Sequence, residues 1–242
     1  MITGPQYQTP ERPALTEDER RAADRPGGIL ALDVATTTGW AYVYPGNQPE
    51  FGAKRCGPIG AKDGEVLHLF ENWLDAELIR LRPKYIVYEA VYVPQRRKSR
   101  KGPRWAGEAP EPSFDLDPTI NVHVLARLFA MTRTVDKIAY QRSIECREIG
   151  GLDWCRWFTG TKGNFGGRAN KKAQTLKAAS TIWGFEGPGG RPLTEDEADA
   201  LGIALYAETV YAPKTAHRRA IGPRRELDLA PHQDRIGRRI PS

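Results

Sequence analysis

Apolar positions along the chain predict a domain in which strands come first and helices then alternate with later strands. Two short apolar runs, residues 29–34 and 85–89, are typical of buried strands, and each carries a carboxylate at or near its end. Further strands are expected at residues 40–44, 50–57 and 143–149, and helices at residues 64–81, 119–133, 151–158, 170–183 and 195–211. The pattern predicts an α/β fold with a mixed central sheet, antiparallel in its first strands and flanked by helices.

Both ends of the chain lack this pattern. Residues 1–27 are polar and rich in Pro and Arg, residues 212–242 are basic, and we expect both segments to be disordered. Residues 28–211 are then a single domain, which fits a chain of 242 residues. Within it, residues 94–118 form a basic Pro- and Gly-rich loop with no strand or helix period. So long a loop inside a compact domain is usually functional.

Composition excludes several classes of protein. No apolar run approaches the roughly 18 residues of a membrane helix, and no apolar signal core begins the chain, so neither a membrane partner nor export is expected. The 3 cysteines have no CxxC spacing, and the 4 histidines have no HxxxH spacing. These spacings argue against a disulfide scaffold and against a Cys- or His-based zinc site. A metal ion here would be held mainly by carboxylates.

Charge is distributed unevenly along the chain. The net charge is +6, yet residues 96–104 contain only basic and uncharged residues, and residues 212–242 are also strongly basic. The remaining body is acidic overall. Basic appendages on an acidic body suit a polyanion, most simply nucleic acid, although solvated surface segments have the same composition.

Two of the predicted strands bring carboxylates to their ends. Asp33 precedes a Thr- and Gly-rich turn, and Glu89 ends the run at residues 85–89. Each residue alone could be a turn-initiating or solvent-facing side chain. On neighbouring strands of one sheet, however, the two carboxylates would repel each other unless a cation lay between them. A divalent metal ion is the simplest such cation.

The last predicted helix offers a second pair of carboxylates. Thr194 and Glu197 have the spacing of a capping box, which accounts for part of the acidic cluster at the helix start. Asp199 instead falls within a run of small and apolar residues, and Asp196 lies three residues earlier on the same face. Two carboxylates on one face of a buried helix indicate metal ligands, and all-oxygen ligation favours Mg²⁺ or Mn²⁺.

Four segments resemble, in order, the RuvC-type Holliday junction resolvases of the RNase H-like superfamily, especially its compact phage-type members. They are residues 29–39 (ILALDVATTTG), 88–92 (YEAVY), 169–174 (ANKKAQ) and 196–201 (DEADAL). The last segment is the most specific, and together the four extend over about residues 28–211. The loop after Glu89 is longer and more basic here than in the compact members.

The resemblance implies an RNase H-like fold and a crossover junction endodeoxyribonuclease, which resolves Holliday junctions or related branched DNA by two-metal phosphodiester hydrolysis. It implies two Mg²⁺ or Mn²⁺ ions held by Asp33, Glu89, Asp196 and Asp199, with Glu195 as an alternative to Asp196. Lys172 is the preferred active-site lysine and Lys171 its rival. The residues expected to contact DNA are Tyr92, Arg96, Arg97, Lys98, Arg100, Lys101, Arg104 and Lys171.

The same resemblance implies a homodimer, because a four-way junction needs two symmetric cuts. Residues 119–133 are the candidate dimer helix, and a further core helix is the alternative. The implied location is the cytoplasm of a bacterial cell or of a phage-infected host, where the partner is branched DNA.

Other functions also fit parts of the sequence. A nuclease of the same fold that acts broadly on flaps and forks is one alternative, and a non-catalytic protein that binds branched DNA is another. Residues 33–39 also resemble the first phosphate loop of sugar kinases and actin-like ATPases, but the sequence has no second such loop.

Overall fold

The computed structural model describes residues 27–44, 47–91, 95–97, 114–116, 121–162 and 165–212. The disordered tails predicted at residues 1–27 and 212–242 lie almost entirely outside the described residues. Within the described part of the chain, no helix is long and apolar enough to cross a membrane.

A mixed five-stranded sheet forms the centre of the domain, with the order β3-β2-β1-β4-β7. Its strands are β1 (Ile29–Asp33), β2 (Thr37–Val43), β3 (Glu50–Arg55), β4 (Tyr85–Glu89) and β7 (Glu145–Ile149). The first three strands pair antiparallel, and β4 and β7 extend the sheet in parallel from β1. This confirms the predicted mixed α/β fold with an antiparallel start.

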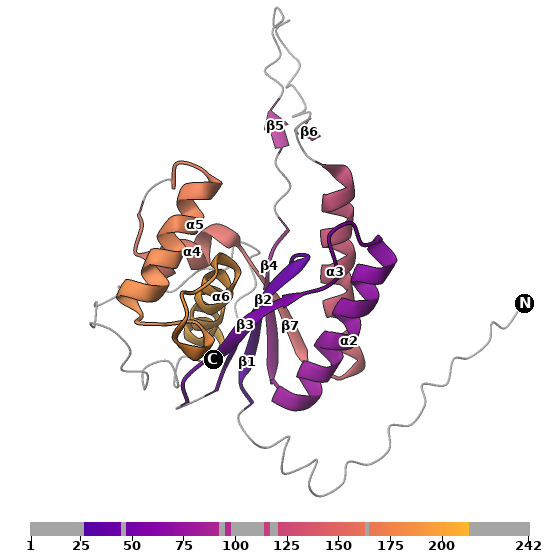
Figure 1. Ribbon diagram of the computed structural model, residues 1–242, viewed down its shortest axis with the longest axis horizontal. Coiled ribbons are helices and arrows are strands. Elements are labelled where there is room, and N and C mark those ends of the chain that lie inside the picture. Colours follow the sequence, from indigo (N-terminus) through magenta and orange to yellow (C-terminus); the bar gives the residue numbers. More distant parts are fainter. Residues whose placement is uncertain are drawn as a thin grey trace, which may run out of the picture.

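Helices cover both faces of this sheet (Figure 1). One face packs against α2 (Asp63–Leu81) and α3 (Val122–Gln141). The other face packs against α4 (Gly151–Thr159) and α6 (Glu195–Tyr211), with α5 (Arg168–Lys177) beside them. A π-helical turn at Ala178–Ile182 continues α5, and a 3-10 turn at Pro188–Gly190 precedes α6.

Side-chain alternation along the strands divides the core in two. On β1, Leu30 and Leu32 are buried against α2 and α3, while Ile29 and Ala31 are buried on the side of α6. Successive strand residues point to opposite faces. The next residue in the α6 series is therefore Asp33, and the same alternation on β4 follows Val87 with Glu89.

Small residues let α6 lie very close to the sheet. A Cβ atom at Gly39 would lie 2.0 Å from the backbone oxygen of Asp196, and one at Gly202 would lie 2.6 Å from the ring of Trp154. The lack of a side chain at Gly39 lets α6 approach β2 closely, and the lack of one at Gly202 lets α4 approach α6. The first turn of α6 is held against β2 directly beside the end of β1, because Gly39 pairs with Asp33 in the sheet.

Two predictions about the middle of the chain are corrected by the structure: the bounds of one helix and the lack of strands in one loop. The predicted helix at 119–133 begins at Val122, after an Asn121 cap that accepts from two backbone amides, and runs to Gln141. It continues because Val135 and Ile138 keep the buried face past residue 133. The supposedly structureless loop 94–118 contains two short antiparallel strands, β5 (Gln95–Arg97) and β6 (Phe114–Leu116). Three-residue strands are too short for a hydrophobic period to indicate them.

The helix α3 is buried over its second half and exposed at its start. Its second half is part of the core, where Met131, Val135 and Ile138 pack against α2, while Val122 and Val124 at its start are exposed. The helix is therefore a core helix over its second half. Its exposed first turns are the part that a partner could cover.

We expect Gly39→Ala to destabilise the protein by about 2 kcal/mol, because an added methyl group would meet the backbone of α6 rather than a movable side chain. The matched control is Gly64→Ala in α2, where an added Cβ meets nothing within 4 Å. Urea unfolding of both variants measures the effect. Equal stability of Gly39→Ala and the wild type would show that α6 is not packed as described.

Candidate active site

Asp33 and Glu89 lie side by side at the ends of two parallel strands. The register pairs Leu32 with Tyr88, so the next residues on β1 and β4 are these two carboxylates. Adjacent strands are about 4.8 Å apart, and both side chains belong to the series that faces α6. The predicted pairing of the two strand-end carboxylates is confirmed.

The N-terminus of α6 brings two more carboxylates to the same end of the sheet. Asp196 lies in the first turn of this helix, and its backbone packs against Gly39. Gly39 is the residue that pairs with Asp33 in the sheet. Asp199, one turn later, is 5% exposed. The helix therefore presents both residues beside β1, as their shared face predicted.

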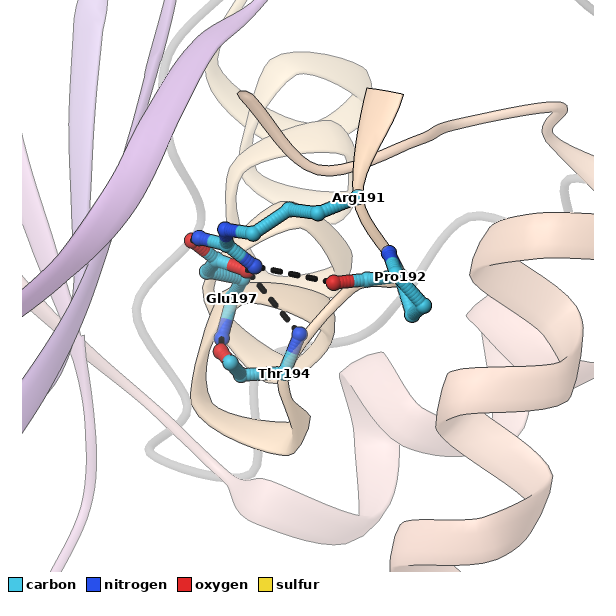
Figure 2. A network of polar contacts seen from close by, with 4 residues as sticks. All are labelled: Arg191, Pro192, Thr194 and Glu197. Carbon is cyan, nitrogen blue, oxygen red and sulfur yellow. Dashed lines mark hydrogen bonds and ion pairs between the residues drawn. The ribbon is translucent and has the colours of Figure 1, made fainter. Parts of the chain in front are cut away.

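A polar network fixes where α6 begins (Figure 2). The hydroxyl of Thr194 accepts from the amide of Glu197, whose carboxylate accepts from the Thr194 amide at 2.9 Å, so the predicted capping box is confirmed. Arg191 donates to the same carboxylate and to the carbonyl of Pro192. Burial would raise the pKa of the fully buried Glu197, but these bonds outweigh it and the pKa is lowered. Glu197 is thus a structural anion.

The site carboxylates crowd one another electrostatically. Burial, together with the charges of Asp199 and Glu89, raises the pKa of Asp33 to about 8. Burial also raises the pKa of Asp199 to about 7, although the charge of Lys171 opposes this shift. Asp33 and Asp199 therefore resist ionisation unless positive charge is supplied nearby.

Two lysines at the start of α5 supply part of that charge. The ammonium of Lys171 lies 3.2 Å from Oε1 of Glu89, and that of Lys172 lies 3.0 Å from Oε2 of Glu195 and 3.6 Å from Oδ1 of Asp196. Partial burial lowers the pKa of Lys172, but these acidic neighbours outweigh it and the pKa is raised. Both candidate lysines thus contact carboxylates of the cluster: Lys171 contacts Glu89, and Lys172 contacts Asp196.

Glu195 and Asp196 differ in exposure. The side chain of Glu195 is 53% exposed and that of Asp196 is 28% exposed, although Lys172 contacts both. The charge of Asp196 acts on both Asp33 and Asp199. The structure therefore favours Asp196 over Glu195 as the α6 residue that belongs to the cluster.

The chemistry of the cluster suits a hard divalent cation. All four carboxylates offer oxygen donors, and Oδ1 of Asp199 is buried with no hydrogen-bond partner. A buried, unpaired carboxylate oxygen is costly without a cation or donor beside it. Among the described residues, however, no three His, Cys, Asp or Glu side chains already converge closely enough to hold a metal ion. The donor set fits a divalent ion, and binding would have to draw the ligands together.

Most residues predicted to contact DNA lie outside the described part of the chain. Arg96 and Arg97 belong to β5, where the backbone alone is described. The others that fall outside it are Tyr92, Lys98, Arg100, Lys101 and Arg104. Of the predicted DNA contacts, Lys171 alone has a described side chain.

Sequence reasoning missed two residues that shape the site. Nε1 of Trp154 in α4 donates to Oε2 of Glu89 at 3.1 Å, and the absent side chain of Gly151 leaves room for the same carboxylate. From the sequence alone, the aromatic residues of α4 are expected only to pack in the core. No sequence signal distinguishes an indole that bonds a site carboxylate from one that only packs.

Comparison with known proteins gives a likeness in structure but none in sequence. No protein-family model matches the chain, and curated proteins give no significant match. RuvC from Thermus thermophilus is similar with a TM-score of 0.50 and 15% identity, over 78% of this chain and 97% of that chain. This similarity shows that the chain has a RuvC-like mixed α/β fold.

Two further structures have lower scores. T. thermophilus RuvC in complex with a Holliday junction substrate has a TM-score of 0.48 and 13% identity, over 78% of this chain and 97% of that one. The yeast mitochondrial Holliday junction resolvase Ydc2 has a TM-score of 0.44 and 11% identity, over 79% of this chain and 84% of that one.

The raised pKa values predict a pH-dependent stability without metal. Asp33 and Asp199 hold protons in the folded protein up to about pH 8 and about pH 7, whereas the unfolded chain releases them near 3.8. Stability from this pair is therefore fully present below about pH 4, is lost progressively as the pH rises from there, and is gone above about pH 8. In EDTA, Asp33→Asn should raise the unfolding temperature by about 5 °C at pH 9 and much less at pH 5.

Calorimetry in EDTA at both pH values measures this difference. Glu186→Gln, which changes an exposed carboxylate away from the cluster, is the control and should show no such pH dependence. A gain for Asp33→Asn that is equal at pH 5 and pH 9 would contradict the described crowding.

Proposed function

We propose that this protein is a metal-dependent endodeoxyribonuclease that cleaves branched DNA, and four-way junctions in particular. The observation that carries the proposal is the cluster of mutually repelling carboxylates from β1, β4 and α6, in which Oδ1 of Asp199 is buried and unpaired. The RuvC-like fold and the resemblance of four ordered segments to RuvC-type resolvases support the same activity.

Asp33, Glu89 and Asp199, supported by Asp196, would hold Mg²⁺ or Mn²⁺, two ions in the reading that the resemblance implies. Bound ions would supply an activated water and would stabilise the leaving oxygen of the phosphodiester. The protein's own part is to fix the four carboxylates on two strands and one rigid helix. Once bound metal had drawn the side chains together, that backbone placement would limit further reorganisation at the moment of reaction.

Positive residues around the cluster would bind the DNA. Lys172 or Lys171 would offset the charge of the scissile phosphate, and Tyr92 would stack on an unpaired base. The basic segment at residues 96–104 would contact phosphates, which positions DNA without reading its sequence. A homodimer would cut a four-way junction twice, and the exposed first turns of α3 are the candidate contact.

Cleavage assays on synthetic DNA test the proposal. A labelled four-way junction, a flap, a fork and a linear duplex are incubated with Mg²⁺, with Mn²⁺ and with EDTA. We expect paired nicks in the junction that require metal and are reduced at least about 1,000-fold by Asp199→Asn, because a ligand of the reacting centre is lost. Glu186→Gln is the matched control and should cleave like the wild type.

The alternatives give different results in the same assay. Equal cleavage of flaps and forks would make the protein a broad branched-DNA nuclease. Tight junction binding without cleavage in either metal would contradict the enzymatic proposal and favour a non-catalytic DNA-binding protein.

A further inference from the structure

Glu89 is held at both of its carboxylate oxygens. Oε2 accepts from the indole of Trp154 at 3.1 Å, and Oε1 lies 3.2 Å from the ammonium of Lys171. A Cβ atom at Gly151 would lie 2.0 Å from Oε1, so a larger residue there would push the carboxylate out of its present position. The side chain of Glu89 is therefore oriented by its surroundings rather than by solvent.

Trp154 contacts both members of this ion pair. The ammonium of Lys171 lies 4.8 Å from the centre of the Trp154 ring, within the range of a cation–π interaction. Trp154 is itself fully buried between α4 and α6, next to Gly202. One rigid side chain thus bonds the carboxylate by its edge and the ammonium by its face.

The same ammonium acts on a second carboxylate. The charge of Lys171 lowers the pKa of Asp199 against the effect of burial. Asp199 nevertheless keeps Oδ1 unpaired, and the side chains of Lys171 and Glu89 are 20% and 21% exposed. The ammonium therefore lies in a half-buried position among carboxylates. A divalent cation would need the same carboxylate oxygens around it.

We infer that Lys171 is a resident counter-ion that occupies the cation position on Glu89, and that Trp154 is the positioning residue that keeps Glu89 oriented when the ammonium leaves. This inference rests on the proposed function only in taking the incoming cation to be the catalytic metal. Divalent cations and the ammonium of Lys171 then compete for the same oxygen. The displaced ammonium, on its flexible stem, is free to approach a phosphate of the DNA.

If the ammonium and the metal compete, removing the charge of Lys171 should strengthen metal binding rather than weaken it. Lys171→Met removes the competing charge and keeps the length of the side chain, so Mn²⁺ should bind at least about tenfold more tightly than to the wild type. Cleavage should decrease in the same variant, because the phosphate loses its ammonium. Lys177→Met, an equal charge change at an exposed position of the same helix, should bind Mn²⁺ like the wild type.

The positioning role of Trp154 is tested in a protein that lacks the ammonium of Lys171. In the Lys171→Met background, Trp154→Phe removes the indole donor to Glu89 together with part of a buried ring, and Mn²⁺ binding should weaken by about tenfold or more while the protein stays folded. Fluorescence gives an independent readout. Mg²⁺ should change the emission of the wild type as the ammonium leaves the Trp154 ring, and this change should be absent in Trp154→Phe.

The experiment is a titration of the full chain with Mn²⁺ in the absence of DNA, followed by electron paramagnetic resonance of the free ion. Tighter binding by Lys171→Met supports the inference. Unchanged or weaker binding by Lys171→Met overturns it, and a wild type that still cleaves junctions leaves the proposed function intact. If neither protein binds Mn²⁺, the inference and the metal-dependent function are both wrong.

Discussion

Burial of carboxylates, together with the repulsion between them, governs the end of the sheet where β1 and β4 finish. Asp33, Glu89, Asp196 and Asp199 lie near one another in a largely buried environment, which raises the pKa of Asp33 to about 8. Such crowding costs folding stability unless positive charge offsets it. Lys171 and Lys172 offset part of it, and the unpaired oxygen of Asp199 shows where more positive charge is needed.

Backbone geometry enforces this crowding. The parallel register of β1 and β4 sets two carboxylates side by side, and the missing side chain of Gly39 lets α6 bring its own pair against them. The ion pair between Arg191 and the buried Glu197 helps to fix the start of the helix. Because two strands and one helix carry all four carboxylates, the backbone keeps them at the same end of the sheet. A cluster retained at such a cost is typical of a functional site.

Much of this arrangement could be predicted from the sequence. Apolar runs that end in Asp33 and Glu89 indicated neighbouring strand ends, and the small residues around Asp199 indicated a closely packed helix. The contacts of Trp154 could not be predicted, because bonding of an indole edge depends on tertiary packing between α4 and β4. The pairing of β5 with β6 was missed for a similar reason, since backbone hydrogen bonds between distant segments leave no trace in a hydrophobic period.

The most direct test of the central claim is a crystal structure of the protein grown with Mn²⁺, with the metal located by its anomalous scattering. We expect density for Mn²⁺ in contact with Asp33 and with oxygens of Glu89 or Asp199, and the ammonium of Lys171 moved away from Glu89. A structure at saturating Mn²⁺ that has no ion among these carboxylates, and keeps Lys171 on Glu89, would contradict it.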